Sequence, residues 1–124
     1  MDETLIHCVD DIEEEKPQHI ISIKFEDEPE PVDAGINIRP FALECLREAN
    51  KHFFVVVFTA SMQTYADAVL DFLDPKNELI QMRLYRNHCH QTEENVYIKD
   101  LRIFKEYDMK DIVIVDNAVY SFGF

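Results

Sequence analysis

The 124-residue sequence predicts a single α/β domain built around a central parallel sheet. Two continuous runs of apolar, mainly β-branched or aromatic residues, at 53–58 and 112–115, are typical of strands that are covered on both faces. Stretches with apolar residues at helical spacing lie between them. Each run ends at a polar residue, Thr59 after the first and Asp116 after the second. This alternation of strand and helix indicates an α/β fold.

The N-terminal third has a different texture from the rest. Two acidic stretches, 10–15 and 26–30, flank a short apolar run at 19–23. We expect a short strand between loops there, as in a hairpin inserted beside the mouth of an active site. The chain therefore divides into an acidic loop and inserted strand region, 7–38, and an α/β core, 39–124.

The core should then follow a regular order of elements. Pro40 suits the first turn of a helix, Ser61 is the expected N-cap of the next, and Asp74-Pro75 should end it. The expected elements are a helix at 40–52, a strand at 53–58, a helix at 61–73, strands at 79–85 and 96–98, a short helix at 101–107 and a strand at 112–115.

Composition excludes several classes of function. The formal net charge is −13, which repels nucleic-acid backbones and anionic lipid surfaces, so we expect no direct nucleic-acid binding. No apolar run in this chain approaches the roughly 20 residues that cross a bilayer. The three cysteines cannot all pair and form no C-x-x-C motif, which fits a reducing compartment.

Polar residues follow several of the expected strands. Functional groups of open α/β sheets gather beyond the carboxyl ends of the strands, and Thr59, Lys99 and Asp116-Asn117 stand at such positions. Taken singly, each is explained by a helix cap, a surface lysine or an ordinary turn. Together they suit phosphoryl transfer, which needs positive charge, hydrogen-bond donors and a metal held by oxygen ligands.

An ordered set of short segments resembles one protein family. The segments are M-D-E-T-L-I-H, R-P-F, V-V-F-T-A-S, Y-A-D, R-L-Y-R, Y-I-K-D-L and V-I-V-D-N. They are similar to the catalytic domain of the RNA polymerase II carboxy-terminal-domain (CTD) phosphatases, the small CTD phosphatase and dullard-like, NIF-type branch of the haloacid dehalogenase superfamily. The resemblance implies a Rossmann-like haloacid dehalogenase fold with its first strand and its C-terminal end missing.

The resemblance also implies roles for particular residues. Asp2 would be the general acid and base and would offer its backbone carbonyl to Mg²⁺. Thr59 would bind the phosphoryl group and Lys99 would neutralise it. Asn117 would be a direct metal ligand, with Asp116 close by, bound to the metal directly or one layer out.

Two arginines fall in contexts similar to those of the family. Arg39 lies in R-P and Arg86 in R-L-Y-R, where an arginine reaches the substrate or supports the pocket. A structural ion pair is the alternative for either. Thr4, the last residue of the first motif, is expected to be structural.

The first motif is incomplete in this chain. The superfamily motif is D-x-D-x-[TV], and Met1 occupies the middle x, so Asp2 and Thr4 match while the leading nucleophilic Asp has no residue. We expect these 124 residues to be inactive as they stand, and an internal methionine taken as the start is the simpler account. A second departure is Ala118-Val119, where the family usually has Ser-Pro.

The leading hypothesis is a Mg²⁺-dependent protein serine/threonine phosphatase that acts on phosphorylated proteins or peptides through an aspartyl-phosphate. Whether this fragment is itself an enzyme stays open. A catalytically inactive phosphopeptide-binding or scaffold module is the main alternative. A small-molecule phosphatase of the same superfamily is another. Family analogy suggests a nuclear or cytoplasmic location, and the oligomeric state is not predicted.

Overall fold

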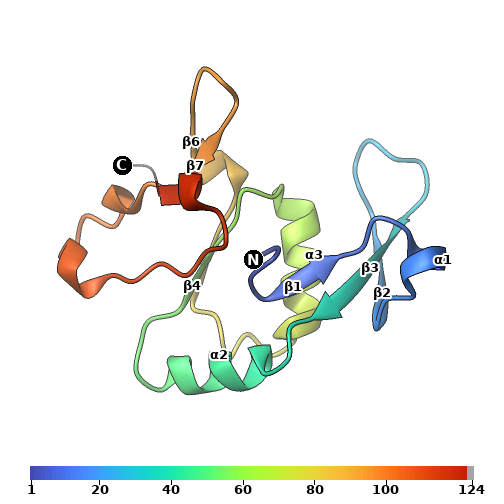
Figure 1. Ribbon diagram of the computed structural model, residues 1–124, viewed down its shortest axis with the longest axis horizontal. Helices are drawn as coiled ribbons and strands as arrows, with labels where there is room; N and C mark the ends of the chain where they lie inside the picture. Colours follow the sequence, from blue (N-terminus) through green and yellow to red (C-terminus); the bar gives the residue numbers. More distant parts are fainter. Residues whose placement is uncertain (123–124) are drawn as a thin grey trace.

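The computed structural model describes residues 1–122 and contains short strands, two longer helices and several 3₁₀ turns (Figure 1). The strands and helices are β1 (Ile6–Cys8), α1 (Ile12–Glu15), β2 (His19–Ile23), β3 (Val32–Ile38), α2 (Ala42–Asn50), β4 (Val56–Phe58), α3 (Gln63–Leu73), β5 (Met82–Leu84), β6 (His90–Gln91) and β7 (Tyr97–Ile98). The 3₁₀ turns are Arg86–His88, Leu101–Ile103, Met109–Asp111 and Val119–Phe122. Within the described residues, no helix has the length and apolar character to span a membrane.

The N-terminal region forms an antiparallel sheet in the order β1-β3-β2. The expected strand at 19–23 is present as β2, and the whole of β2 pairs with β3 from His19↔Ile36 to Ile23↔Val32. Gly35 is required in this sheet, because a Cβ there would lie 2.6 Å from carbon atoms of both Pro17 and Val9. The inserted hairpin therefore packs closely against the loop that precedes it.

The core lies between this sheet and α3. Ala66, Val69 and Leu70 of α3 are completely buried, as is Ile36 of β3. The rings of His19 and Phe72 lie 4.9 Å apart and tie β2 to α3. The apolar spacing that predicted a helix after residue 61 thus corresponds to the face of α3 that the molecule buries.

The buried carboxylate of Asp74 turns the chain from α3 toward β5. It accepts hydrogen bonds from the backbone N–H groups of Glu78, Leu79 and Ile80 at 2.9–3.1 Å. The next strand, β5, pairs in parallel with β4 in the register Val56↔Met82 to Phe58↔Leu84. Thr59 follows this parallel pair at its carboxyl end, as the sequence predicted.

Several expected elements differ in the structure. The strands expected at 53–58 and 79–85 are shortened to Val56–Phe58 and Met82–Leu84, and Phe53 and Phe54 are exposed. The helix expected at 101–107 is reduced to the 3₁₀ turn Leu101–Ile103, and no strand is assigned at 112–115. The stretch 112–115 is nevertheless extended, because half-buried Ile112 and Ile114 alternate with exposed Val113 and Val115. A strand is completed by a hydrogen-bonded neighbour, and none of residues 1–122 pairs with this stretch.

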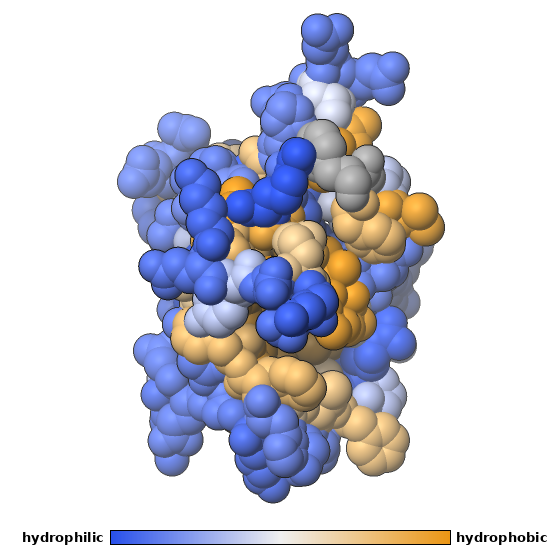
Figure 2. Space-filling view, turned by 90° about the vertical axis from the view of Figure 1, so that its left-hand side faces the viewer, coloured by the Kyte–Doolittle hydropathy of each residue, from blue (hydrophilic) through white to orange (hydrophobic). Residues whose placement is uncertain are grey.

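The same stretch lies on the side of the molecule away from the N-terminal sheet (Figure 1). Figure 2 looks onto that side and shows apolar groups at the surface. Val113 is 82% exposed and Val115 is 77% exposed. The sequence pattern predicted burial on both faces, whereas the structure buries only one.

Candidate active site

Asp2 lies where two side chains hold its carboxylate. The hydroxyl of Tyr65, from α3, donates to Oδ1 of Asp2 at 2.6 Å, and the hydroxyl of Ser61 donates to Oδ2 at 2.8 Å. Burial, followed by the hydrogen bond to Asp2, raises the pKa of the Tyr65 phenol, so this residue is a neutral donor. Both carboxylate oxygens of Asp2 therefore have a fixed direction.

Thr59 lies at the end of β4 and is 2% exposed. Its backbone N–H donates to the carbonyl of Leu84 at 2.9 Å, which extends the pairing of β4 with β5 by one residue. Its hydroxyl oxygen accepts from the backbone N–H of Ser61 at 3.0 Å. This hydrogen bond holds the turn that follows β4 in the conformation that directs Ser61 toward Asp2.

Lys99 and Asp116 form a buried ion pair. The Lys99 ammonium donates to Oδ2 of Asp116, and their side chains are 8% and 6% exposed. Oδ1 of Asp116 accepts from the backbone N–H of Ala118 at 2.9 Å. Burial alone would raise the pKa of the Asp116 carboxyl, but the hydrogen bonds from Lys99 and Ala118 outweigh it and hold the pKa below its usual value. Asp116 is therefore a carboxylate at neutral pH.

These groups line one hollow of about 500 Å³, which we call the strand-end pocket. Its lining includes Asp2, Thr59, Ser61, Arg86, Tyr97, Lys99, Asp116 and Asn117. The structure thus brings together six of the seven predicted site residues, and only Arg39 lies outside the pocket. The Thr59 hydroxyl and the cationic groups of Lys99 and Arg86 are of the kinds that bind a phosphoryl group.

Met1 also lines the strand-end pocket. Burial, and next the repulsion from Lys99, lower the pKa of its α-amino group below the usual value. That nitrogen therefore lies near the Lys99–Asp116 pair. A residue joined to Met1 through this nitrogen would begin inside the same pocket.

The two predicted arginines have different positions. Arg39 does not line the strand-end pocket: its guanidinium donates to the carbonyls of Thr4 and Glu3 at 2.6 and 3.1 Å and holds the backbone just after Asp2. Arg86 does line it, and its Nε donates to the carbonyl of Ala60 at 2.7 Å. Arg39 thus supports the backbone beside the site, while Arg86 is available to a bound molecule.

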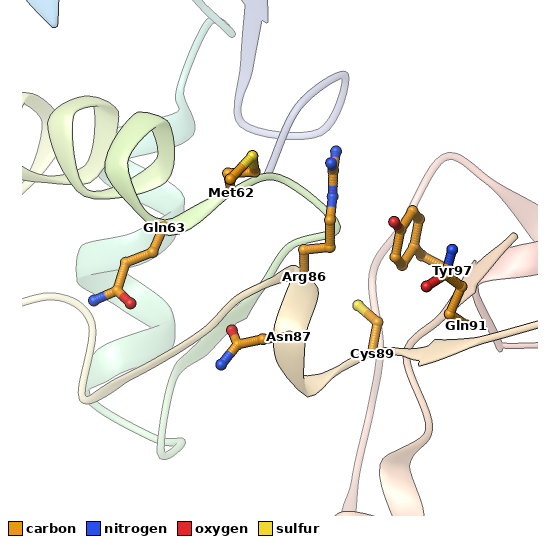
Figure 3. A pocket seen from close by; sticks show the side chains of 7 residues that line it. All are labelled: Met62, Gln63, Arg86, Asn87, Cys89, Gln91 and Tyr97. Carbon is orange, nitrogen blue, oxygen red and sulfur yellow. The ribbon is translucent and has the colours of Figure 1, made fainter. Parts of the chain in front are cut away.

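A second hollow of about 490 Å³ adjoins the first, and we call it the side pocket. It is lined by Met62, Gln63, Arg86, Asn87, Cys89, Gln91 and Tyr97 (Figure 3). Arg86 and Tyr97 belong to both pockets, and the guanidinium carbon of Arg86 lies 4.9 Å from the centre of the Tyr97 ring. This stacked pair is the wall between the two hollows.

Two residues that contact Asp2 were not among the predicted site residues. Ser61 was expected to cap α3, but the helix begins after Met62 without a side-chain cap, and the Ser61 hydroxyl bonds to Asp2 instead. Tyr65 was noted only as part of Y-A-D. In the sequence, Tyr65 stands one helical turn after Ser61, which follows a strand. This spacing does not distinguish a tyrosine of the active site from a tyrosine of the core.

The donor set of the strand-end pocket fits a hard cation. Asp2, Asp116 and Asn117 supply oxygen atoms, which is what Mg²⁺ selects. Among the described residues, the carboxamide of Asn117 has no hydrogen-bond partner, whereas both oxygens of Asp116 already accept hydrogen bonds. No group of three or more His, Cys, Asp or Glu side chains with metal-binding geometry occurs within residues 1–122. Asn117 and a backbone carbonyl are therefore the groups most free to bind a cation.

Comparison with known proteins supports a common origin along the whole chain. The model of the family described as NLI interacting factor-like phosphatase matches residues 1–124. The chain is 40% identical over 124 residues to CTD small phosphatase-like protein 2 of Dictyostelium discoideum, covering 100% of this chain and 21% of that protein. It is 35% identical over 124 residues to CTD nuclear envelope phosphatase 1B of Danio rerio, covering 95% of this chain and 49% of that protein. The chain thus spans about a fifth to a half of the length of these relatives.

Solved structures give the same result at the level of the fold. The structure of the fission yeast RNA polymerase II CTD phosphatase Fcp1 bound to beryllium fluoride matches with a TM-score of 0.75 and 18% identity, covering 98% of this chain and 36% of that one. A second structure of Fcp1 matches with a TM-score of 0.73 and 20% identity, covering 91% and 34% of the two chains.

Proposed function

Because this chain belongs to the NLI interacting factor-like phosphatase family, we propose that its strand-end pocket is the active site of a Mg²⁺-dependent protein serine/threonine phosphatase of the RNA polymerase II CTD phosphatase type. The fold is the Rossmann-like haloacid dehalogenase fold that the sequence predicted. The observation that carries the proposal is the convergence of Asp2, Thr59, Lys99 and Asn117 on one pocket.

Lys99 and Thr59 are the groups that would hold the phosphoryl oxygens. The Lys99 ammonium is almost fully buried, so its attraction for an anion is screened little by water. Asp116 fixes its position through their ion pair, and the Thr59 hydroxyl lies in the same pocket. These two residues would supply the positive charge and the donor that stabilise the transferring group.

Asp2 would move the proton. In the proposed first step, the carboxylate of an Asp joined to Met1 attacks phosphorus, the bond to the seryl oxygen breaks, and Asp2 gives its proton to that oxygen. In the second step, Asp2 accepts a proton from water as the water oxygen attacks the aspartyl-phosphate and inorganic phosphate leaves. The hydrogen bonds from Tyr65 and Ser61 support this role, since they fix the carboxylate in the pocket.

Asn117 and the backbone carbonyl of Asp2 would hold the metal ion, with Asp116 beside them. When bound, Mg²⁺ would neutralise charge on the phosphoryl oxygens. The free carboxamide of Asn117 and the oxygen-only donor set support this assignment.

A second function, phosphopeptide binding without hydrolysis, has its own supporting observation. Asp2 and Asp116 both use their two carboxylate oxygens as hydrogen-bond acceptors, and Glu3 bonds to His7 at 2.6 Å. Each described carboxylate that lines the pocket is thus already engaged by a neighbouring group, and none of them has the role of nucleophile in the proposed chemistry. Lys99 and Thr59 could bind a phosphate group without a nucleophilic carboxylate.

One experiment tests both functions. The 124-residue chain is compared with chains extended before Met1 by an apolar strand that ends in Asp or, as the control, in Ala. With Mg²⁺ present, we expect all three to bind a phosphoserine peptide, and only the Asp-extended chain to release phosphate from it and from an aryl phosphate. Binding without hydrolysis by the Asp-extended chain would instead favour the binding module.

A further inference from the structure

The side pocket has no place in the chemistry proposed above, yet it shares a wall with the strand-end pocket. Arg86 stands between Met62 and Tyr97 in the close view, with Cys89 and Gln91 below and beyond it (Figure 3). The thiol of Cys89 donates weakly to the carbonyl of Thr59 at 3.8 Å, so the side pocket reaches the backbone of a strand-end residue. The two hollows are therefore neighbours that share Arg86 and Tyr97.

Apart from Arg86, the described residues that line the side pocket carry no charged side chain. Its only formal charge is the Arg86 guanidinium, which repels a cation. The amide nitrogens of Gln63 and Gln91 each use one of their two N–H groups, to Asp67 and Asn95 at 3.3 and 2.8 Å, and their carbonyl oxygens remain as acceptors. Among the described residues, the Asn87 carboxamide has no hydrogen-bond partner and offers both donors and an acceptor. An uncharged group that donates hydrogen bonds fits these acceptors of the side pocket best.

The Arg86 guanidinium faces the proposed phosphoryl site. Its Nε is engaged by Ala60, and within residues 1–122 it has no carboxylate partner. A phosphoryl group bound in the strand-end pocket would pair with the positive charge of Arg86. The side pocket would then present only neutral hydrogen-bonding groups and the apolar surfaces of Met62 and Cys89.

We propose that the side pocket is a substrate subsite, which takes the uncharged, hydrogen-bonding side chain (Asn, Gln, Ser or Thr) of a residue one or two positions from the phosphorylated serine or threonine. This inference rests on the proposed function of the strand-end pocket. An extended peptide advances about 3.3 Å per residue. If the phosphate of such a peptide is held in the strand-end pocket, only residues close to the phosphorylated one can reach past Arg86 and Tyr97 into the side pocket. Asn87 is then a specificity-determining residue.

The test is binding of phosphoserine peptides to the 124-residue chain, which needs no hydrolysis. Four peptide sets carry Asn or Gln, Asp or Glu, Lys or Arg, or Leu at the positions flanking the phosphoserine. A fifth set carries Lys four residues away and measures the general attraction of a chain with net charge −13 for basic peptides. We expect the amide set to bind about fivefold more tightly than either charged set, the order of an exposed ion-pair or hydrogen-bond energy.

Replacing Asn87 by Asp gives the sharper result. It keeps the size of the side chain and adds a negative charge, so it should move the preference toward Lys or Arg at the flanking positions by about two- to fivefold, without altering the effect of the distant Lys. Asn77→Asp is the charge-matched control, because Asn77 lies in neither pocket and accepts a hydrogen bond from Arg83 that Asp preserves. This control should leave all preferences as they are.

The outcomes separate the subsite from the phosphatase proposal. Equal affinity for the four sets, or unchanged preferences in Asn87→Asp, would overturn the subsite while leaving phosphopeptide binding intact. Failure of every peptide to compete with inorganic phosphate would overturn both the subsite and the assignment of the strand-end pocket. Binding that follows the expected order supports the subsite, whether or not an Asp-extended chain hydrolyses the peptide.

Discussion

The hydroxyl of Tyr65 donates to Oδ1 of Asp2 at 2.6 Å across a sequence separation of 63 residues. Asp2 precedes the inserted hairpin and Tyr65 is on α3, so this bond joins the first motif to the helix that follows β4. With the Ser61 hydroxyl at 2.8 Å on the other oxygen, it leaves the carboxylate little freedom to rotate. The contact makes Tyr65 a positioning residue for the proposed acid and base.

We therefore expect Tyr65→Phe in the Asp-extended chain to lower kcat about tenfold and to leave KM nearly unchanged, because misdirected proton transfer affects the transition state more than substrate binding. Steady-state hydrolysis of an aryl phosphate measures both constants. Tyr107→Phe is the matched control, because Tyr107 is exposed and lines neither pocket. An unchanged kcat in Tyr65→Phe would remove Tyr65 from the site.

The Lys99–Asp116 pair makes a prediction about stability. Removing one partner leaves a buried charge without compensation, so Lys99→Met and Asp116→Leu should each lower the free energy of unfolding by about 3 kcal/mol. The double variant should lose much less than the sum, since it buries no unpaired charge. Urea unfolding of the 124-residue chain gives the three values. Additive losses would mean that the two charges do not interact.

The Asp67 carboxylate should make the stability depend on acid pH. Burial acts to raise its pKa, but hydrogen bonds from Tyr85 and Arg83, at 2.5 and 2.9 Å, outweigh burial and lower it. A carboxyl group whose pKa is lower in the folded state contributes stability that is fully present above its unfolded pKa of about 4 and is lost as the pH falls through the folded value. Asp67 therefore stabilises the folded chain at neutral pH, and this stabilisation is lost in acid.

Comparing the wild type with Asp67→Asn tests this sign. At pH 7 the variant should be about 1 kcal/mol less stable, because charge-assisted hydrogen bonds become neutral ones at a partly exposed site. The two free energies of unfolding should converge as the pH falls from about 4 through the lower pKa of the folded state, where the folded wild-type carboxylate becomes protonated. A difference that stays constant from pH 7 to pH 3 would contradict the assignment.

The sequence predicted the local elements well where one element buries its own apolar face. The helices α2 and α3, the inserted strand β2 and the placement of Thr59 after β4 all follow from spacing that each segment carries within itself. The residues expected at strand ends also meet in the strand-end pocket, although among them only Thr59 follows a strand of a parallel pair.

The predictions from sequence were wrong where the structure of a segment depends on contacts with another segment. The run 112–115 has the composition of a buried strand, but strand formation needs a partner, and the structure leaves Val113 and Val115 exposed. Ser61 matched a helix cap by position, yet its hydroxyl bonds to Asp2, a contact that no local pattern encodes. The sequence did not predict the side pocket either, because its lining comes from separate segments that include α3, the Arg86–His88 turn, β6 and β7.

Metal dependence is the next prediction. In the Asp-extended chain, EDTA should abolish hydrolysis and added Mg²⁺ should restore it. Asn117→Ala should raise the Mg²⁺ concentration needed for half-maximal activity about tenfold or more, because it removes a ligand, while Asn117→Asp keeps an oxygen ligand and should raise it less. A Mg²⁺ titration of initial rates distinguishes the variants. Activity that persists in EDTA would contradict the metal assignment.

The extended stretch 112–115 makes the last prediction. Unpaired strand edges with exposed apolar side chains associate with one another, so the 124-residue chain should be poorly soluble. Val113→Lys places a charge on the exposed side of this stretch and should lower light scattering on concentration without changing the urea midpoint. Ile114→Lys carries the same charge one residue later, on the half-buried side, and should lower the free energy of unfolding by about 1–3 kcal/mol. Equal effects of the two variants on scattering and stability would show that the alternation of exposed and half-buried residues does not persist in solution.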